Sequence, residues 1–222
     1  MPSLVELWLR RFAASARAAH FVFSAGTLFG ATTTWWGAGK ARRTPHEGVD
    51  FGRYAPLSGS AGGGAGALLA AIAAVQPGCG VPCLCDGAVA CVIRDFICET
   101  LVVEHPQLSQ REGRAGMVLC SLYAHIRAQR RRGERVRAGE RLCSVAPSPT
   151  SAPAHLHLSL AWLPRVLVSE QLTWKALVMD ARVVFVDPLA NVDSRLWTIS
   201  DVRTVEAVVV TERERAAVAA PE

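Results

Sequence analysis

Five side chains in three short strings carry ligand and acid–base chemistry in this 222-residue sequence. Two histidines and one aspartate are a complete set of protein ligands for a first-row metal ion. The two histidines that remain are enough for general acid–base catalysis beside such an ion. The five residues are His46, Asp50, His125, His155 and His157.

The backbone around the first two of these residues predicts a transition from a loop to a strand. His46 and Asp50 are four positions apart, a spacing that fits one face of either a helix or a strand. Pro45 lacks a backbone N–H, and Gly48 lies between the two candidate ligands. Both residues disfavour a helix, so we expect a loop that leads into a strand.

The last string has a clearer pattern. Residues 155–160 alternate polar and apolar side chains, with leucine at every second position. This period of two predicts a strand with one apolar face. His155 and His157 then project from the same face, where two imidazoles can share one site.

Zinc is the metal that these residue types suit best. A catalytic zinc ion takes three protein ligands and keeps one position for water, whose pKa it lowers to about 7 while it polarises a substrate carbonyl. Neighbouring imidazoles have pKa values of about 6.5 and can orient the water, take its proton or stabilise an oxyanion. The residue types therefore agree with metal-assisted hydrolysis.

The three strings also resemble those of a known family. They are Pro45–Phe51, Tyr123–Ile126 and His155–Leu158. In this order they resemble the motifs of the lysostaphin/LytM-type zinc metalloendopeptidases, which cut peptide cross-bridges in bacterial cell walls. Ile126 stands where that family has leucine. The similarity extends over roughly residues 21–189.

The resemblance implies a role for each of the five residues. His46, Asp50 and His157 would hold zinc, while His125 and His155 would act on the water and the oxyanion. The implied protein is a zinc-dependent endopeptidase, a hydrolase that acts on peptide bonds in peptidoglycan cross-links. The implied location is the cell envelope or periplasm.

Three segments depart from the family pattern. Residues 144–153 are proline-rich where the family has a glycine-rich approach, which predicts a stiffer groove wall. Residues 58–66 are rich in Gly, Ala and Ser and lead into an apolar stretch at 67–75, which we read as a loop and a short helix. A basic run from Arg127 to Arg137 enlarges the loop beside the site.

Two other functions fit parts of the pattern. A non-catalytic cell-wall binding or regulatory module on the same fold would bind without turnover, but such relatives typically lose ligands and this chain keeps all five residues. A phosphocarrier would also have facing histidines on a related β architecture. Asp50 as a ligand and the order of the three motifs count against that reading.

The formal net charge of +5 and pI of about 9.0 leave the partner open. The arginines of one segment are Arg127, Arg130, Arg131, Arg132, Arg135, Arg137 and Arg141. Such a cluster fits contact with an anionic wall polymer, a nucleic acid or an anionic membrane. Aromatic residues are not interleaved with it, so we favour a solvated basic loop and expect no nucleic-acid partner.

The seven cysteines are read most simply as buried free thiols, because cysteine packs as a small hydrophobic residue. Cys79, Cys83 and Cys85 could bind a second metal ion or form a disulfide, but their spacing is not that of a usual zinc ribbon. Many unpaired thiols argue mildly against an oxidising compartment. This conflicts with an envelope location.

The overall pattern predicts a mostly β fold, an antiparallel sandwich or barrel of the duplicated hybrid motif type. We expect an amphipathic helix within residues 1–20, a metallopeptidase-like β domain at 21–200, and a C-terminal strand and frayed tail at 201–222. The helix would pack on the domain or on a membrane surface. No segment has the length and apolarity of a transmembrane span. Expected strands include 81–85, 88–97, 100–104, 117–125, 142–146, 155–163, 182–186 and 204–211, with a hairpin turn at Asp86-Gly87.

Overall fold

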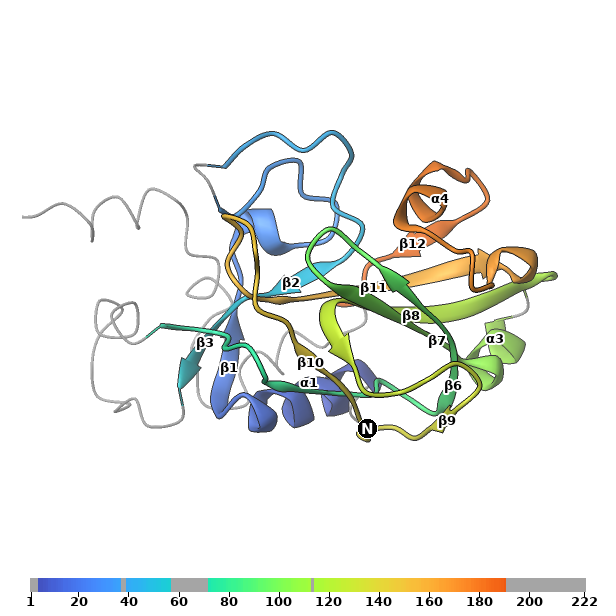
Figure 1. Ribbon diagram of the computed structural model, residues 1–222, viewed down its shortest axis with the longest axis horizontal. Coiled ribbons are helices and arrows are strands. Elements are labelled where there is room, and N and C mark those ends of the chain that lie inside the picture. Colours follow the sequence, from blue (N-terminus) through green and yellow to red (C-terminus); the bar gives the residue numbers. More distant parts are fainter. Residues whose placement is uncertain (1–3, 37–38, 57–71, 113, 191–222) are drawn as a thin grey trace, which may run out of the picture.

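The computed structural model describes residues 4–36, 39–56, 72–112 and 114–190 (Figure 1). The elements in chain order are α1 (Leu4–Ser15), β1 (Ala18–Val22), η1 (Ala25–Thr27), β2 (Val49–Phe51), β3 (Arg53–Pro56), β4 (Ala73–Ala74), β5 (Gly80–Pro82), β6 (Gly87–Arg94), β7 (Glu99–Glu104), α3 (Pro106–Glu112), β8 (Met117–Ala128), β9 (Arg135–Val136), β10 (Arg141–Val145), β11 (Leu156–Pro164), η2 (Arg165–Leu167), α4 (Trp174–Met179) and β12 (Val184–Val186).

The strands form one large and one small sheet. The large sheet has the order β12-β11-β8-β7-β6-β9, with β2 paired to β11 and β10 paired to both β8 and β5. The small sheet has the order β1-β3-β4. Every pairing between the named strands is antiparallel. The prediction of a mostly β, antiparallel fold with an N-terminal helix is therefore confirmed.

Alternation along the central strands buries both faces of the large sheet. On β7, Leu101 and Val103 pack in the same apolar cluster as Phe12 of α1. Val102 points the other way, into a second cluster that contains Leu177 of α4. The period of two thus divides one strand between two cores. The long central strands are consequently buried over most of their length.

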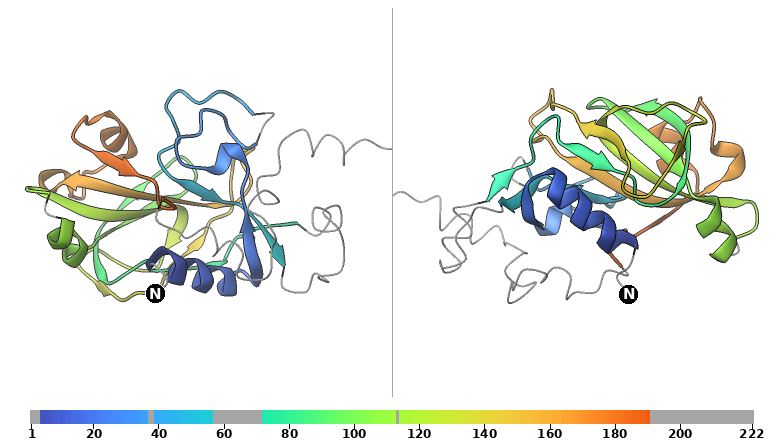
Figure 2. Two further views of the ribbon diagram at one scale, coloured as in Figure 1. Left: turned by 180° about the vertical axis from the view of Figure 1, so that it is seen from behind. Right: turned by 90° about the horizontal axis from the view of Figure 1, so that it is seen from below.

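Helix α1 closes one of these cores. Trp8 and Phe12 are fully buried, and Phe12 makes ring contacts with Phe21 and Phe51 at centroid distances of 4.8 and 5.8 Å. The Trp8 indole donates a hydrogen bond of 2.7 Å to the carbonyl of Pro82. The helix lies along the lower side of the molecule, in full view in the right panel of Figure 2. Of the two positions expected for its apolar face, the structure therefore shows packing on the domain.

Two local predictions are wrong, and tertiary contacts explain both. Asp86-Gly87 does not connect a hairpin, because β5 pairs with β10 and Gly87 begins a strand that pairs with β7 and β9. Cys83 instead exchanges backbone hydrogen bonds with the turn at Gly139 and Glu140. The helix expected over residues 67–75 is also wrong at its C-terminal end, where a short strand is found.

Ala73 and Ala74 form strand β4 against β3, although alanine favours helices. The edge of β3 offers these backbone groups partners, and such tertiary pairing overrides intrinsic propensity. The first part of the expected helix, residues 67–71, lies outside the described residues. So does the strand expected at 204–211, together with the whole C-terminal segment 201–222.

No helix in the described part of the chain combines the length and apolarity needed to cross a membrane. All seven cysteines are present in the described segments, and each is a free thiol. Burial raises the pKa of Cys83 to about 11 and that of Cys85 to about 12, so both are neutral thiols at pH 7. The reading of the cysteines as free thiols is confirmed, and five of the seven are buried.

Candidate metal centre

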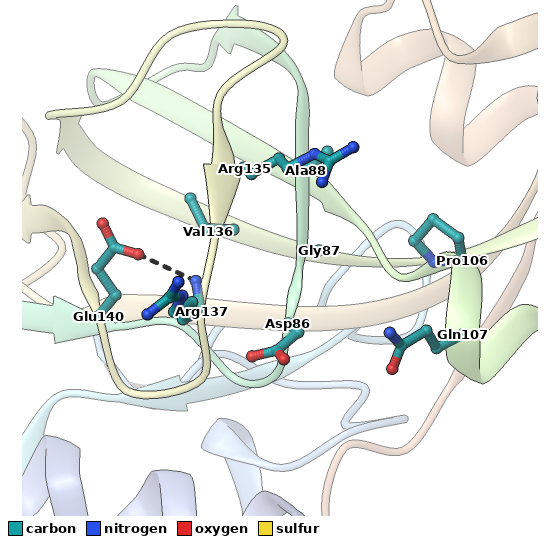
Figure 3. Close-up of a pocket in the computed structure, with 9 residues that line it drawn as sticks. All are labelled: Asp86, Gly87, Ala88, Pro106, Gln107, Arg135, Val136, Arg137 and Glu140. Atoms are coloured by element: carbon teal, nitrogen blue, oxygen red, sulfur yellow. Dashed lines mark hydrogen bonds between the residues drawn. The ribbon is translucent and has the colours of Figure 1, made fainter.

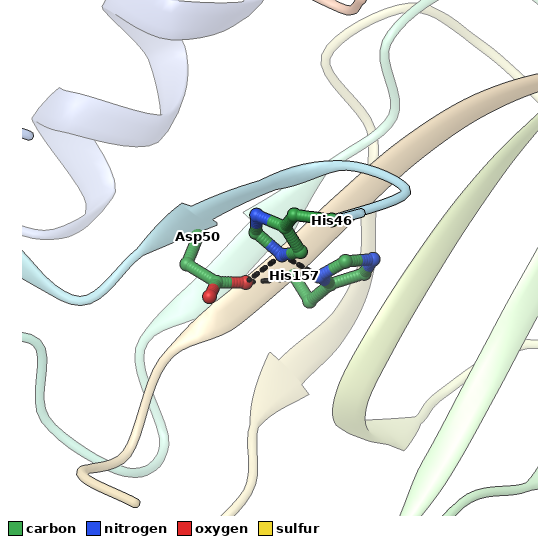
Figure 4. Close-up of side chains that lie close together, drawn as sticks. All are labelled: His46, Asp50 and His157. Atoms are coloured by element: carbon green, nitrogen blue, oxygen red, sulfur yellow. Dashed lines mark hydrogen bonds and ion pairs between the residues drawn. The ribbon is translucent and has the colours of Figure 1, made fainter. Parts of the chain in front are cut away.

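His46, Asp50 and His157 converge on one point (Figure 4). Nε2 of His46 lies 3.1 Å from Oδ1 of Asp50 and 2.9 Å from Nδ1 of His157. The remaining pair, His157 Nδ1 and Asp50 Oδ1, is also 2.9 Å apart. The three side chains are almost completely buried, with at most 6% of any residue exposed.

Strand register brings the second and third of these residues together. In the β2–β11 pair, Asp50 stands directly opposite His157, and in the β11–β8 pair His157 stands opposite Ala124. Side chains at paired positions of antiparallel strands lie on the same face and within contact distance. The predicted transition from loop to strand is present, since β2 begins at Val49.

Gly48 explains how the loop can bring His46 so close. A Cβ atom at Gly48 would lie 2.3 Å from the carbonyl oxygen of Leu158 and 2.8 Å from Nε2 of His157. Only glycine allows this close approach of the loop to β11. The His46 ring can therefore reach the strand that carries His157.

Hydrogen bonds to outer partners orient each candidate ligand. Nδ1 of His46 lies 2.9 Å from the carbonyl oxygen of Leu28, so this nitrogen donates a hydrogen bond and Nε2 is the nitrogen left for a metal ion. Nε2 of His157 pairs with the Ser159 hydroxyl at 2.8 Å, on the side of the ring away from Asp50. Carbonyl and hydroxyl partners of this kind usually accompany metal-ligating histidines.

The carboxylate of Asp50 is held by its other oxygen. The Trp35 indole donates to Oδ2 at 2.8 Å, and Arg42 Nη2 lies 3.5 Å from the same atom. These contacts leave Oδ1 facing the two imidazoles. The carboxylate is therefore set to offer one oxygen to the shared point.

The protonation states of Asp50 and His157 suit the binding of a cation. Burial alone raises the pKa of Asp50, but the favourable interactions of the carboxylate with His155, His46 and His157 outweigh it, so that the pKa lies well below its usual value. Burial also lowers the pKa of His157 to about 4, despite the opposing effect of Asp50. At pH 7 the centre thus contains an anionic carboxylate and a neutral imidazole, the forms that bind metals.

This donor set fits a zinc ion. Electron-rich atoms that converge to about 3 Å need a shared proton or a cation between them, and two imidazole nitrogens with one carboxylate oxygen are typical zinc ligands. Ligand atoms at 2.0–2.2 Å from a tetrahedral ion lie roughly 3.3–3.6 Å apart. The observed separations of 2.9–3.1 Å would need to open by roughly half an ångström.

His155 and His125 lie beside this centre. Nδ1 of His155 is 2.7 Å from the Pro153 carbonyl oxygen and therefore carries the proton, while Nε2 lies 3.7 Å from Oδ1 of Asp50. The His125 ring lies 4.8 Å from that of His155 and 5.8 Å from that of His157, between centroids. The structure thus brings all five residues together.

The position of His155 differs from its prediction in one respect. Strand β11 begins at Leu156, so His155 stands immediately before the strand, although both imidazoles face Asp50 as expected. The proline-rich approach places the Pro153 carbonyl where it holds the His155 ring. This local hydrogen bond orients the ring, whose Nε2 lies 3.7 Å from Oδ1 of Asp50.

A hollow of about 90 Å³ lies over the centre. Its walls include residues that the motifs do not contain, namely Trp36, Arg42, Phe96 and Trp174. The sequence analysis missed all of these, and it missed Trp35 and Asp95 behind the walls. The only local signal is the position of Trp35, Trp36 and Arg42 shortly before Asp50, since Phe96 and Trp174 reach the site only through the fold.

A larger hollow, of about 620 Å³, lies elsewhere on the surface, between β6, β9 and the start of α3 (Figure 3). The guanidinium groups of Arg135 and Arg137 point in different directions there. Asp86 is engaged by the backbone N–H of Ala138. Size alone does not make this hollow a reaction site, because its polar groups do not converge as those around Asp50 do.

Part of the arginine-rich segment is paired with acidic side chains. Arg130 forms ion pairs with Glu134 and Glu140, and Arg132 lies 2.8 Å from Glu170. These pairs offset some of the positive charge that the sequence concentrates here. Contact of this segment with an anionic polymer stays a prediction.

Comparisons with known proteins find similarity only among solved structures. Neither a protein-family model nor a curated protein matches the sequence. The chain is similar to the solution structure of lysostaphin, with 16% identity over 53% of this chain and 36% of that one, and a TM-score of 0.36. It is also similar to the catalytic domain of the antimicrobial peptidase lysostaphin from Staphylococcus simulans, with 16% identity over 61% and 77% of the two chains and a TM-score of 0.39.

A third similar structure is a zinc-containing peptidase from Vibrio cholerae, with 18% identity over 65% of this chain and 36% of that one, and a TM-score of 0.35. The matched region thus spans about a third of the chain in the lysostaphin solution structure. Lysostaphin-type peptidases are the family that the three sequence motifs resemble, and they are among the proteins whose solved structures are similar to this chain.

Proposed function

We propose that this protein is a zinc-dependent endopeptidase that hydrolyses peptide bonds, with peptidoglycan cross-links as its substrate. The observation that supports this most is the convergence of His46, Asp50 and His157 beneath a hollow that His125 and His155 also line. The cross-link as substrate is the finer part of the proposal and comes from the motif resemblance.

The proposed zinc ligands are Nε2 of His46, Oδ1 of Asp50 and Nδ1 of His157. Zinc at this point would supply a Lewis acid and would lower the pKa of a water molecule. Outer partners of the ligands keep these atoms available: the Leu28 carbonyl fixes the His46 ring, and Trp35 holds the unused oxygen of Asp50.

His155 is proposed to take a proton from the attacking water. Its Nδ1–H is used by the Pro153 carbonyl, so Nε2 carries the free lone pair on the side of the ring that faces Asp50. Burial lowers the pKa of His155, which keeps this ring neutral and able to accept a proton at pH 7. As the water oxygen bonds to the peptide carbonyl carbon, the proton moves to Nε2 of His155.

His125 is proposed to orient the attacking water by accepting a hydrogen bond from it at Nε2. The ring lines the same hollow and lies against His155, so one water molecule can reach both. When the C–N bond breaks, the proton held by the site passes to the leaving amine. Positioned imidazoles in such roles typically contribute about 10²–10⁴-fold to the rate.

The deciding experiment combines metal analysis with mass spectrometry of digests. Purified protein is expected to carry one zinc ion per chain and to release products with new amino and carboxyl termini from peptidoglycan. A chelator should stop cleavage, and added zinc should restore it. Binding of muropeptides without any cut would favour the rival function, a non-catalytic cell-wall binding or regulatory module.

A further inference from the structure

The side chain of Asp95, which lies outside the three motifs, accepts four hydrogen bonds. Asp95 follows β6, in the turn before β7, and its side chain is fully buried. Oδ1 accepts from the backbone N–H groups of Ile97 and Cys98, at 2.7 and 2.8 Å. Oδ2 accepts from the hydroxyl of Thr100 at 2.8 Å and from the backbone N–H of His125 at 2.9 Å. This carboxylate therefore joins a turn to the backbone of a candidate catalytic residue.

The backbone of His125 needs such support. Its φ of 63° lies in the left-handed region, which few residues other than glycine adopt. In the β7–β8 pair, Glu99 is opposite Ile126 and Thr100 is opposite Ala124, so His125 is an extra residue on β8. A β-bulge of this kind leaves one residue unpaired in the ladder and changes the direction of its side chain.

The core packing shows what the bulge achieves. Tyr123 and Ile126 both pack in the cluster that includes Phe12, although residues three apart on a regular strand face opposite sides. The extra residue resolves this mismatch and turns the His125 side chain into the hollow. Asp95 takes up the His125 N–H that the ladder leaves free.

The same carboxylate also faces the imidazole of His125. Nδ1 lies 3.3 Å from Oδ1 of Asp95, within ion-pair distance, although the ring is turned so that no hydrogen bond forms. Burial alone raises the pKa of Asp95, but the His125 side chain and the amides of His125 and Cys98 outweigh it and hold the pKa well below its usual range. The group beside the ring is therefore an anion at pH 7.

One more contact connects Asp95 to the opposite wall. The Trp174 indole donates to Oγ1 of Thr100 at 2.7 Å, and this hydroxyl donates to Asp95. Trp174 lines the hollow and contacts the His157 ring at 5.6 Å between centroids. Phe96, which follows Asp95, contacts His125 at 4.7 Å. A single buried carboxylate thus holds two parts of the wall, His125 directly and Trp174 through Thr100.

We propose that Asp95 is the positioning residue of the site: it holds the bulge at His125 and keeps the proton of that imidazole on Nδ1, so that Nε2 is presented to the substrate. This role rests on the proposed function only in that a substrate is bound, because the bulge is present and the protonated nitrogen of His125 can be measured without turnover. Hydrogen bonds that look poorly aligned before substrate binds can tighten in the complex.

The test variant is Asp95→Asn, which keeps the size and one acceptor oxygen but removes the charge. The matched control is Asp187→Asn, because Asp187 also accepts the backbone N–H two residues ahead, that of Leu189, but is exposed and outside the site. In Asp95→Asn we expect kcat to fall about 10–100-fold with KM almost unchanged, as for other residues that orient active groups. Zinc content should stay at the wild-type level, and Asp187→Asn should behave as wild type.

The distinguishing readout is the ¹⁵N NMR spectrum of the imidazoles, which reports which nitrogen carries the proton. His125 should show the Nδ1–H pattern in wild type and a mixture of patterns in Asp95→Asn. An unchanged His125 pattern together with an unchanged kcat would overturn the proposal. If no substrate is cleaved by wild type, the endopeptidase proposal fails, while the NMR spectra still decide the role of Asp95.

A second variant covers poor folding of Asp95→Asn. Thr100→Val removes the hydroxyl that donates to Oδ2 of Asp95 and accepts from the Trp174 indole, and it keeps the carboxylate. It should give a smaller fall in kcat, roughly 3–10-fold for the loss of one of the four hydrogen bonds to the carboxylate, and a partial change in the His125 spectrum. A Thr100→Val protein with wild-type kcat and spectrum would contradict the proposed connection.

Discussion

Two buried networks lie against the same large sheet, one around His105 and one around Asp50, and they differ in how the histidine nitrogens are used. Around His105 each nitrogen has a partner of its own: Nδ1 lies 3.0 Å from the Asp86 carbonyl oxygen, and Nε2 lies 2.8 Å from the Ser121 hydroxyl. Ser121 hydrogen-bonds in turn to Tyr123, whose phenol accepts the backbone N–H of Leu84. This network is closed and needs no further atom.

Around Asp50 the nitrogens share one point. Nε2 of His46 and Nδ1 of His157 face each other and the same oxygen of Asp50. Burial lowers the pKa of both His105 and His157, so burial does not distinguish the two groups. The difference is convergence: a satisfied network stabilises the fold, whereas lone pairs aimed at one point leave room for a cation.

The largest expected effect comes from removing a ligand. His157→Ala should lose zinc and reduce cleavage about 10³-fold or more, because the Lewis acid accounts for several kcal/mol of transition-state stabilisation. Elemental analysis of the purified variant, with a peptide-cleavage assay, checks this. Zinc retained at one ion per chain would remove His157 from the ligand set.

The next variant separates catalysis from metal binding within the same group. His155→Ala should keep its zinc but lower kcat about 10²–10⁴-fold, because the proton acceptor is gone while the three ligands are intact. The measurement is kcat at full zinc occupancy. Hydrolysis at the wild-type rate would show that His155 has no such role.

A smaller effect is expected from the partner of the unused Asp50 oxygen. Trp35→Phe removes the indole N–H that donates to Oδ2 and should weaken zinc affinity about 10–100-fold. Competition with a chelating dye measures the affinity. Trp36→Phe is the control for loss of a neighbouring indole, and an equal loss in both variants would argue against orientation of Asp50 by Trp35.

A substitution in the network around His105 should lower stability without affecting zinc binding or catalysis. Ser121→Ala leaves Nε2 of His105 without its hydroxyl partner and should lower the free energy of unfolding by about 1–3 kcal/mol, the usual cost of an unsatisfied buried polar group. Zinc content and kcat should not change. Chemical denaturation gives the first quantity, and zinc loss in this variant would mean that the two groups are coupled.

The pH dependence of the metal-free protein compares the two groups directly. His157 has a folded pKa of about 4 against a usual value of 6.5, so between these values the unfolded chain binds more protons than the folded one. Its contribution to the free energy of unfolding is complete above pH 6.5 and is lost as the pH falls towards 4, at up to about 1.4 kcal/mol per pH unit. His105 acts with the same sign, since its folded pKa is also lowered.

Denaturation of metal-free protein at several pH values gives this slope. In His157→Gln the free energy of unfolding should change less steeply with pH, because the contribution of His157 is lost. The contribution of His105 should remain. At still lower pH, protonation of Asp50 and Asp95 should destabilise the fold further, because the folded pKa values of both carboxyls are lowered. A slope unaffected by the substitution would show that His157 is not buried as a neutral ring.

The sequence by itself determined the local parts of this account. Period-two alternation at 155–163 predicts β11 to within one residue, because alternation follows from strand geometry alone. Pro45 and Gly48 predict the loop before β2 for an equally local reason. The three motifs contain all five residues that the structure brings together.

Only the tertiary structure decided how those residues are held. Trp35, Arg42 and Asp95 carry no motif, and they act through contacts whose partners lie 15, 8 and 30 positions away in the chain. The bulge at His125 depends on which face of β8 meets the core, which a local pattern does not specify. Register between β2 and β11 places Asp50 opposite His157 across 107 positions, because pairing of strands is a property of the whole sheet.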